Sequence, residues 1–190
     1  MRRLPLILSL IALALAGCDD PLGPQPWNET PIEVQLWSID RTEHIGLPSA
    51  FDFFNRQRVA VEDPRSALGW DVVVSDVEGG LAFVPAGAFP DIGTDVGIAV
   101  ITGVSFDDLL EAPRDANAYI TDRAVPLVEG GVYVVRTRRA ACATFGFSTF
   151  TPRYGKVTVT EIDLEEGSVV FKVVVNPNCN DRSFVSPEDD

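Results

Sequence analysis

The sequence offers few side chains for acid–base, nucleophilic or metal chemistry. Its single histidine is His44, and it contains no serine-nucleophile, zinc-helix or phosphate-loop motif. A catalytic triad would have to use His44 without a nucleophile motif to accompany it. Carboxylate pairs that hydrolyse glycosides are recognised by their separation in space, which a sequence with 28 acidic residues does not reveal. We therefore expect a protein that is not an enzyme and has no metal site.

Three arginines, Arg136, Arg138 and Arg139, form the one basic cluster of a chain whose formal net charge is −13. A guanidinium group suits a carboxylate because it presents a planar fork of N–H donors. Strand alternation predicts that Arg136 and Arg138 share one face and that Arg139 lies on the other. Two interpretations stay open, namely a clamp for a carboxylate ligand and a solvated strand end whose arginines pair with nearby acidic residues.

Cys18 ends an apolar stretch that begins after Arg2 and Arg3. The charged start, the apolar stretch and the small residues before the cysteine are typical of a secretory signal. The Leu-Ala-Gly-Cys ending resembles the lipobox of bacterial lipoproteins, and the stretch is too short to span a bilayer. We expect residues 1–17 to be removed as a signal peptide and Cys18 to carry the lipid that holds the protein at the membrane.

Residues 18–30, rich in proline and polar side chains, predict an extended tether that precedes a single domain at residues 31–190. The expected location is the bacterial cell envelope, at the outer membrane or the cell surface. Asp19 resembles an inner-membrane retention signal of some bacteria and keeps the inner membrane open as an alternative. Nucleic acid is a poor partner for so acidic a chain, because its binding depends on lysine and arginine neutralising phosphates.

Cys142 and Cys179 are the cysteines that remain once Cys18 carries lipid. An even pair in an exported protein predicts a disulfide. A thiolate site for metal or haem is disfavoured, because the pair lacks C-x-x-C spacing and the chain has almost no histidine.

From Pro31 onward the pattern is that of β-strands. Apolar and polar residues alternate with a period of two, or form short apolar runs between turns, at residues 32–36, 51–53, 70–74, 81–84 and 97–102. Only Ser105–Ala112 predicts a helix, with Ser105 as N-cap and Pro113 after its end. The sequence therefore predicts an all-β domain of two packed antiparallel sheets with one short helix.

The C-terminal third predicts a meander of three strands, at residues 132–137, 156–163 and 169–175. If consecutive strands run antiparallel, the loop after the first strand and the end of the third strand lie at the same end of the sheet. Cys142 falls in that loop and Cys179 lies just beyond that end, which supports the disulfide.

Four segments, taken in order, resemble the HmuY-like haem-binding lipoproteins. They are Ala50–Val61 (AFDFFNRQRVAV), Gly69–Gly80 (GWDVVVSDVEGG), Val125–Arg138 (VPLVEGGVYVVRTR) and Tyr154–Val175 (YGKVTVTEIDLEEGSVVFKVVV). They look like that family's first aromatic hairpin, its Trp-Asp strand with a glycine pair, its strand ending in Val-Arg-Thr, and its closing hairpin. The resemblance implies an all-β, lipid-anchored, extracytoplasmic protein that holds haem through two axial side chains, typically histidines and in some relatives methionines.

The resemblance makes haem a possible cofactor, but the expected mature chain contains His44 and no methionine. The candidate ligand-binding residues are then His44 as a lone axial ligand, Tyr133 as a ligand of ferric iron, and Arg136 and Arg138 as clamps for the haem propionates. A surface role for His44 and a packing role for Tyr133 are the alternatives. Two functions stay open, namely a binder of haem or a related ligand with non-standard ligation, and an envelope protein-interaction module on the same scaffold that binds no haem.

Overall fold

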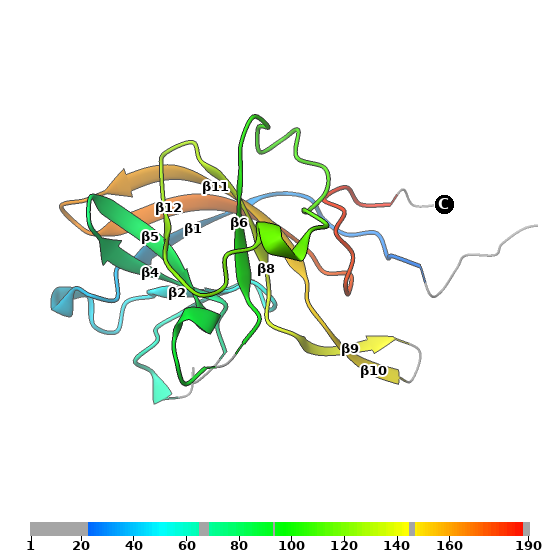
Figure 1. Ribbon diagram of the computed structural model, residues 1–190, viewed down its shortest axis with the longest axis horizontal. Coiled ribbons are helices and arrows are strands. Elements are labelled where there is room, and N and C mark those ends of the chain that lie inside the picture. Colours follow the sequence, from blue (N-terminus) through cyan, green and yellow to red (C-terminus); the bar gives the residue numbers. More distant parts are fainter. Residues whose placement is uncertain (1–22, 65–68, 93, 145–146, 188–190) are drawn as a thin grey trace, which may run out of the picture.

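A computed structural model describes residues 23–64, 69–92, 94–144 and 147–187 of the chain. Cys18, and with it the expected signal peptide, lies outside the described residues. Two five-stranded antiparallel sheets pack against each other (Figure 1), so the predicted all-β fold of two packed sheets is confirmed. In this part of the chain, the structure contains no helix that is long and apolar enough to cross a membrane.

The first sheet is built around the predicted meander. Its strands, in spatial order, are β1 (Ile32–Trp37), β12 (Ser168–Asn176), β11 (Tyr154–Asp163), β8 (Val132–Arg136) and β6 (Gly97–Ile101). Tyr154 at the start of β11 lies opposite both Arg136 and Asn176. The end of β8, the start of β11 and the end of β12 therefore meet at one end of the sheet.

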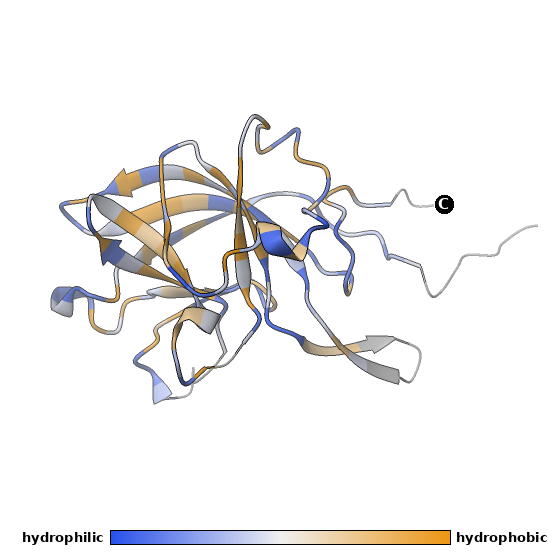
Figure 2. Ribbon diagram, viewed as in Figure 1, coloured by the Kyte–Doolittle hydropathy of each residue, from blue (hydrophilic) through white to orange (hydrophobic). Residues whose placement is uncertain are grey.

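The second sheet consists of shorter strands. In spatial order they are β3 (Gln57–Val59), β2 (Ala50–Asp52), β4 (Val72–Val77), β5 (Gly80–Pro85) and β7 (Val125–Pro126). Figure 2 shows apolar residues along the strands of both sheets. The main core lies between the sheets, where Phe171 of β12 packs edge-on against Phe51 and Phe83 at ring distances of 5.9 and 5.3 Å. Burial of such rings is among the largest single contributions to a core.

Around β8 the first sheet is buried on both faces. Tyr133 and Val135 point into the core between the sheets, whereas Val132 and Val134 belong to a second apolar cluster on the outer face. Residues of the 102–124 connection and of the C-terminal segment cover that face, with Phe106, Leu109, Tyr119 and Phe184 among them. Strand β8 therefore reads as a nearly continuous apolar run because neither of its faces is solvated.

The predicted helix at Ser105–Ala112 is reduced to a single turn. Its capping interaction forms, since Asp108 N donates to Ser105 Oγ at 3.2 Å and Leu109 N donates to Ser105 O at 3.1 Å. Beyond this turn the C-terminal segment takes the backbone groups that a helix would need, because Phe184 N donates to Leu110 O and Ala112 N donates to Arg182 O. Among the described residues, short 3₁₀ turns form at η1 (Thr42–His44), η3 (Ala86–Ala88) and η4 (Ala116–Ala118).

A hairpin that the sequence reasoning missed joins β8 to β11. It consists of β9 (Ala140–Thr144) and β10 (Phe147–Thr151), and it projects from the end of the sandwich (Figure 1). Cys142 therefore lies in a strand, where we expected a loop. The predicted disulfide is confirmed, since Cys142 and Cys179 are joined at an S–S distance of 2.03 Å. A hairpin without further strands has little stability of its own, so this bond fastens it to the segment that follows β12.

The expected tether is partly attached to the domain. Gln25 N donates to Asn178 Oδ1 at 2.8 Å, and Asn178 Nδ2 donates to Gln25 O at 2.9 Å. Trp27 packs against the outer apolar cluster, and its backbone N–H donates to Ser186 Oγ. The chain thus enters the domain beside Cys179, at the end from which the hairpin projects.

Candidate functional site

The structure separates Arg136 from Arg138, so the prediction that they share a face was wrong. Strand β8 ends at Arg136, and the alternation of its side chains does not continue through the buried Thr137. Arg138 turns toward the second sheet, whereas Arg136 and Arg139 gather around Asp95.

Arg138 binds carboxylates of its own chain. Its Nη1 and Nη2 donate to the two carboxylate oxygens of Asp52 at 3.1 and 3.0 Å, and Nη1 also lies 3.1 Å from Asp71 Oδ1. Both aspartates are buried. Burial raises the pKa of Asp71, and the charge of Arg138 opposes that rise. A hollow of about 460 Å³ borders Asp52 and Arg138. The guanidinium N–H groups of Arg138 already bind Asp52 and Asp71, so they are not free for a ligand carboxylate in this hollow.

Tyr133 lies in the core between the sheets. Its hydroxyl accepts from Val128 N at 3.0 Å and donates to Pro126 O at 3.1 Å. Burial raises the pKa of Tyr133, which disfavours the phenolate that ligates ferric iron. The structure therefore gives Tyr133 the packing role.

His44 lies at the far end of the first sheet from the arginines. It ends η1, its ring stands edge-on to Trp37, and its Nε2 is 3.7 Å from Glu166 Oε1 in the turn between β11 and β12. Arg136 pairs with the opposite end of β11, which has 10 residues and thus spans about 30 Å. His44 and Arg136 therefore do not meet at one ligand.

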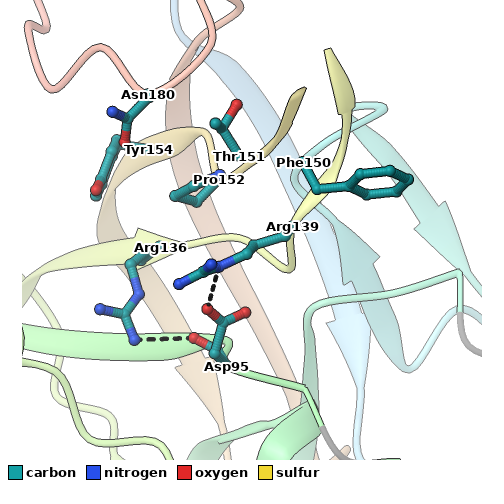
Figure 3. Close-up of a pocket in the computed structure, with 8 residues that line it drawn as sticks. All are labelled: Asp95, Arg136, Arg139, Phe150, Thr151, Pro152, Tyr154 and Asn180. Atoms are coloured by element: carbon teal, nitrogen blue, oxygen red, sulfur yellow. Dashed lines mark hydrogen bonds and ion pairs between the residues drawn. The ribbon is translucent and has the colours of Figure 1, made fainter. Parts of the chain in front are cut away.

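A pocket of about 310 Å³ lies at the base of the projecting hairpin (Figure 3). The side chains that line it come from the segment before β6, from the end of β8 and the residues after it, from the hairpin base, and from the segment after β12. They are Asp95, Arg136, Arg139, Phe150, Thr151, Pro152, Tyr154 and Asn180. Among them, Arg136 and Arg139 belong to the basic cluster that the sequence analysis described.

The pocket contains more positive than negative charge. Arg139 Nε donates to Asp95 Oδ2 at 2.8 Å, whereas Arg136 Nη2 donates to the backbone oxygen of Asp95 at 2.9 Å. The Arg136 guanidinium lies 4.9 Å from the centre of the Tyr119 ring, and within the described residues it has no carboxylate partner. Two guanidinium groups thus face one carboxylate, which leaves a surplus of one positive charge.

Two buried polar atoms at the pocket have no hydrogen-bond partner. They are Arg136 Nε and Thr151 Oγ1. A buried donor or acceptor that is left unpaired costs about 1–3 kcal/mol, so a hydrogen bond from ordered water or from a ligand that reaches these atoms would be favourable.

The disulfide and the hydrogen bonds next to it hold the pocket together. Asn180 follows Cys179, adopts a left-handed backbone conformation with φ of 58°, and donates through its N–H to Pro152 O at 2.9 Å. Asparagine tolerates this conformation better than most side chains. The sequence signal that could have revealed the hairpin is the run at Phe147–Thr151, which is rich in aromatic and β-branched residues.

In the part of the chain that the structure describes, no three His, Cys, Asp or Glu side chains come together as a metal-binding group. Comparison of the chain with protein-family models, with curated proteins and with solved structures finds no match.

Proposed function

We propose that the protein is a lipid-anchored, non-enzymatic interaction module of the bacterial cell envelope, on an HmuY-like scaffold, that binds a protein partner through the β9–β10 hairpin. The observation that carries the proposal is the hairpin itself, which projects from the sandwich and is fastened by the Cys142–Cys179 disulfide. A preorganised element loses little conformational entropy when it binds.

An exposed aromatic side chain at the hairpin supports this use. Phe150 is 68% exposed, the same exposure as Ile45 and the highest among the large apolar side chains that the structure describes. Figure 3 shows its ring directed away from Arg136 and Arg139. Aromatic residues that protrude from a rigid element are typical anchors of protein interfaces.

The attachment of Gln25 beside the hairpin indicates which end of the domain faces the membrane. Between Cys18 and Gln25 the chain spans at most about 25 Å when fully extended. A lipid on Cys18 would therefore keep the hairpin end of the domain nearest the membrane, and the partner is expected at or close to the membrane surface.

Haem binding is the less favoured alternative. His44, Tyr133 and the arginines cannot serve one haem together, because they lie at opposite ends of the sheet or in the core. That leaves His44 as a lone axial ligand. An interaction role requires none of these side chains to meet.

Photo-crosslinking in the native envelope tests the proposed function. A photoreactive phenylalanine analogue replaces Phe150, and a matched chain carries it at Leu164, which is 55% exposed in the turn at the opposite end of the sheet. We expect a discrete protein adduct from position 150 and none from position 164. Absence of an adduct at position 150, or equal adducts at both positions, would overturn the proposal.

A further inference from the structure

We propose that the pocket at the base of the hairpin is a carboxylate-binding site in which Arg136 and Arg139 hold one ligand carboxylate. The inference rests on the proposed function, because it assigns the chemistry that a partner or ligand must present at the hairpin. The carboxylate belongs either to a free small molecule or to the C-terminus of a docked peptide, and the two sources share the same recognition.

The charge of the pocket favours a monoanion. Asp95 neutralises one of the two guanidinium groups through its ion pair with Arg139. The remaining positive charge of Arg136 balances a single carboxylate, whereas a dianion such as phosphate would be repelled by Asp95. A single arginine fork also matches the planar carboxylate geometrically.

The unpaired donor of Arg136 supplies the binding site for that carboxylate. Its Nε is buried without a partner, while Nη2 is fixed on the Asp95 backbone oxygen. The guanidinium also lies over the Tyr119 ring, 4.9 Å from its centre. Arg136 is therefore positioned before a ligand arrives, and Thr151 Oγ1 offers a further unpaired group in the same pocket.

Arg139 can change its partner when a ligand binds. Its side chain is 64% exposed and its bond to Asp95 lies at the surface, so solvent screens it and it contributes little stability. A ligand carboxylate can take its free donors without breaking a buried contact. The Asp95 carboxylate then acts as an internal competitor for the ligand.

The site has a size limit. Its volume of about 310 Å³ lies at the lower end of the range for small-molecule sites. It fits a carboxylate with a small organic group, or the last residue of a peptide chain, with Pro152 and Tyr154 as the apolar and aromatic walls.

Calorimetric titration of the full chain in a carboxylate-free buffer tests the site. The probes are benzoate, the peptide acetyl-Ala-Ala-Phe with a free C-terminus, and its C-terminal amide. We expect saturable binding of at least one acid and none of the amide. Tighter binding of the peptide acid identifies a partner's C-terminus as the source, and tighter binding of benzoate identifies a free small molecule.

Matched variants decide whether the pocket is responsible. Arg136→Gln and Arg139→Gln should each weaken binding by about tenfold or more, and Asp95→Asn should strengthen it because the internal competitor is removed. The control is Arg123→Gln, which removes an equally exposed arginine that is paired with Asp122 and should leave binding unchanged. Thermal melting of each variant verifies folding. Because Arg139 is exposed, Arg139→Gln tests the site even if replacement of the more buried Arg136 disturbs the fold.

Two results would overturn the carboxylate site, namely no saturable binding of either acid, or arginine variants that bind as the unmodified chain does. Because the crosslinking test uses Phe150 and needs neither arginine, a hairpin adduct together with failed titrations would refute the carboxylate site alone.

Discussion

Arg138 Nη1 lies 3.1 Å from Asp71 Oδ1, and this contact joins the end of the first sheet to the start of the second sheet's β4. The same guanidinium binds Asp52 of β2 through two hydrogen bonds. Asp71 also accepts from the backbone N–H groups of Phe53 and Arg138 at 2.8 and 2.9 Å. The two sheets are thus connected by a buried ionic group in addition to their apolar core.

Replacement of Arg138 should destabilise the fold strongly. Arg138→Gln removes the cation that contacts both buried carboxylates, and we expect the free energy of unfolding to fall by about 3–5 kcal/mol. Urea denaturation measures the change. In contrast, Arg123→Gln removes an exposed arginine and should change stability by less than about 0.5 kcal/mol. Equal effects of the two substitutions would contradict a structural role for the buried group.

The strand faces could be predicted from the sequence, but the direction of Arg138 could not. Alternation along Val132–Val135 holds because both faces of β8 pack against apolar neighbours. It fails after Arg136 because the strand ends there, and the carboxylates of Asp52 and Asp71 then decide where Arg138 points. Those aspartates are 86 and 67 residues away along the chain, so the local sequence pattern around Arg138 does not indicate the contact.

The composition of the pocket was equally inaccessible to sequence reasoning. Asp95 and Asn180 reach it from segments on either side of the meander, and only the sheet topology together with the disulfide brings them to Arg136. The cysteine pair was predictable because two cysteines of a chain that is expected to be exported have few alternatives. Its neighbour Asn180 carried no comparable signal.

Loss of the disulfide should weaken both the fold and the hairpin. The bond closes a loop with a sequence separation of 37 residues, for which the chain-entropy model gives about 3–4 kcal/mol. A Cys142→Ser, Cys179→Ser chain should therefore melt about 10 °C lower. Peptide mapping after alkylation without reductant provides the check, since labelling of Cys142 and Cys179 in the unmodified protein would contradict the pairing.

Lys156 should make stability depend on alkaline pH. Its Nζ is buried and donates to the backbone oxygens of Phe106 and Leu109 at 2.8 and 3.1 Å. Burial lowers the pKa of Lys156, an effect that the charges of Asp107 and Glu29 oppose. Between this lowered pKa and the ordinary value of 10.5, the unfolded chain binds more protons than the folded chain, so stability from this group rises with pH.

Comparison with Lys156→Met isolates that effect. The neutral amine still has two N–H groups for its two acceptors, so deprotonation removes the cost of the buried charge without removing the hydrogen bonds. The unfolding free energy of the unmodified chain, measured relative to that of the variant, should increase as the pH rises toward 10.5. A difference that is independent of pH would show that Lys156 titrates normally in the fold.

Attachment at Cys18 should determine where the protein is found. Cys18→Ala removes the only cysteine of the Leu-Ala-Gly-Cys ending, and we expect the protein to leave the membrane fraction while its fold is retained. Mass spectrometry of the native N-terminus checks the modification directly. An unlipidated N-terminus at any other residue would contradict the proposed anchor.

Haemin should bind the unmodified chain and His44→Ala equally weakly. The geometry supports this expectation, because His44 lies near Glu166 at the far end of the first sheet, Tyr133 donates to Pro126 O in the core, and Arg138 is held by Asp52. No two of the candidate ligands can then approach one iron without rearrangement of the core or of the sheet end. The measurement is a titration followed in the Soret region, with only the broad band of free or nonspecifically bound haemin expected from both chains. A sharp, saturable shift that is lost in His44→Ala would instead establish single-histidine haem ligation and would overturn the proposed interaction module.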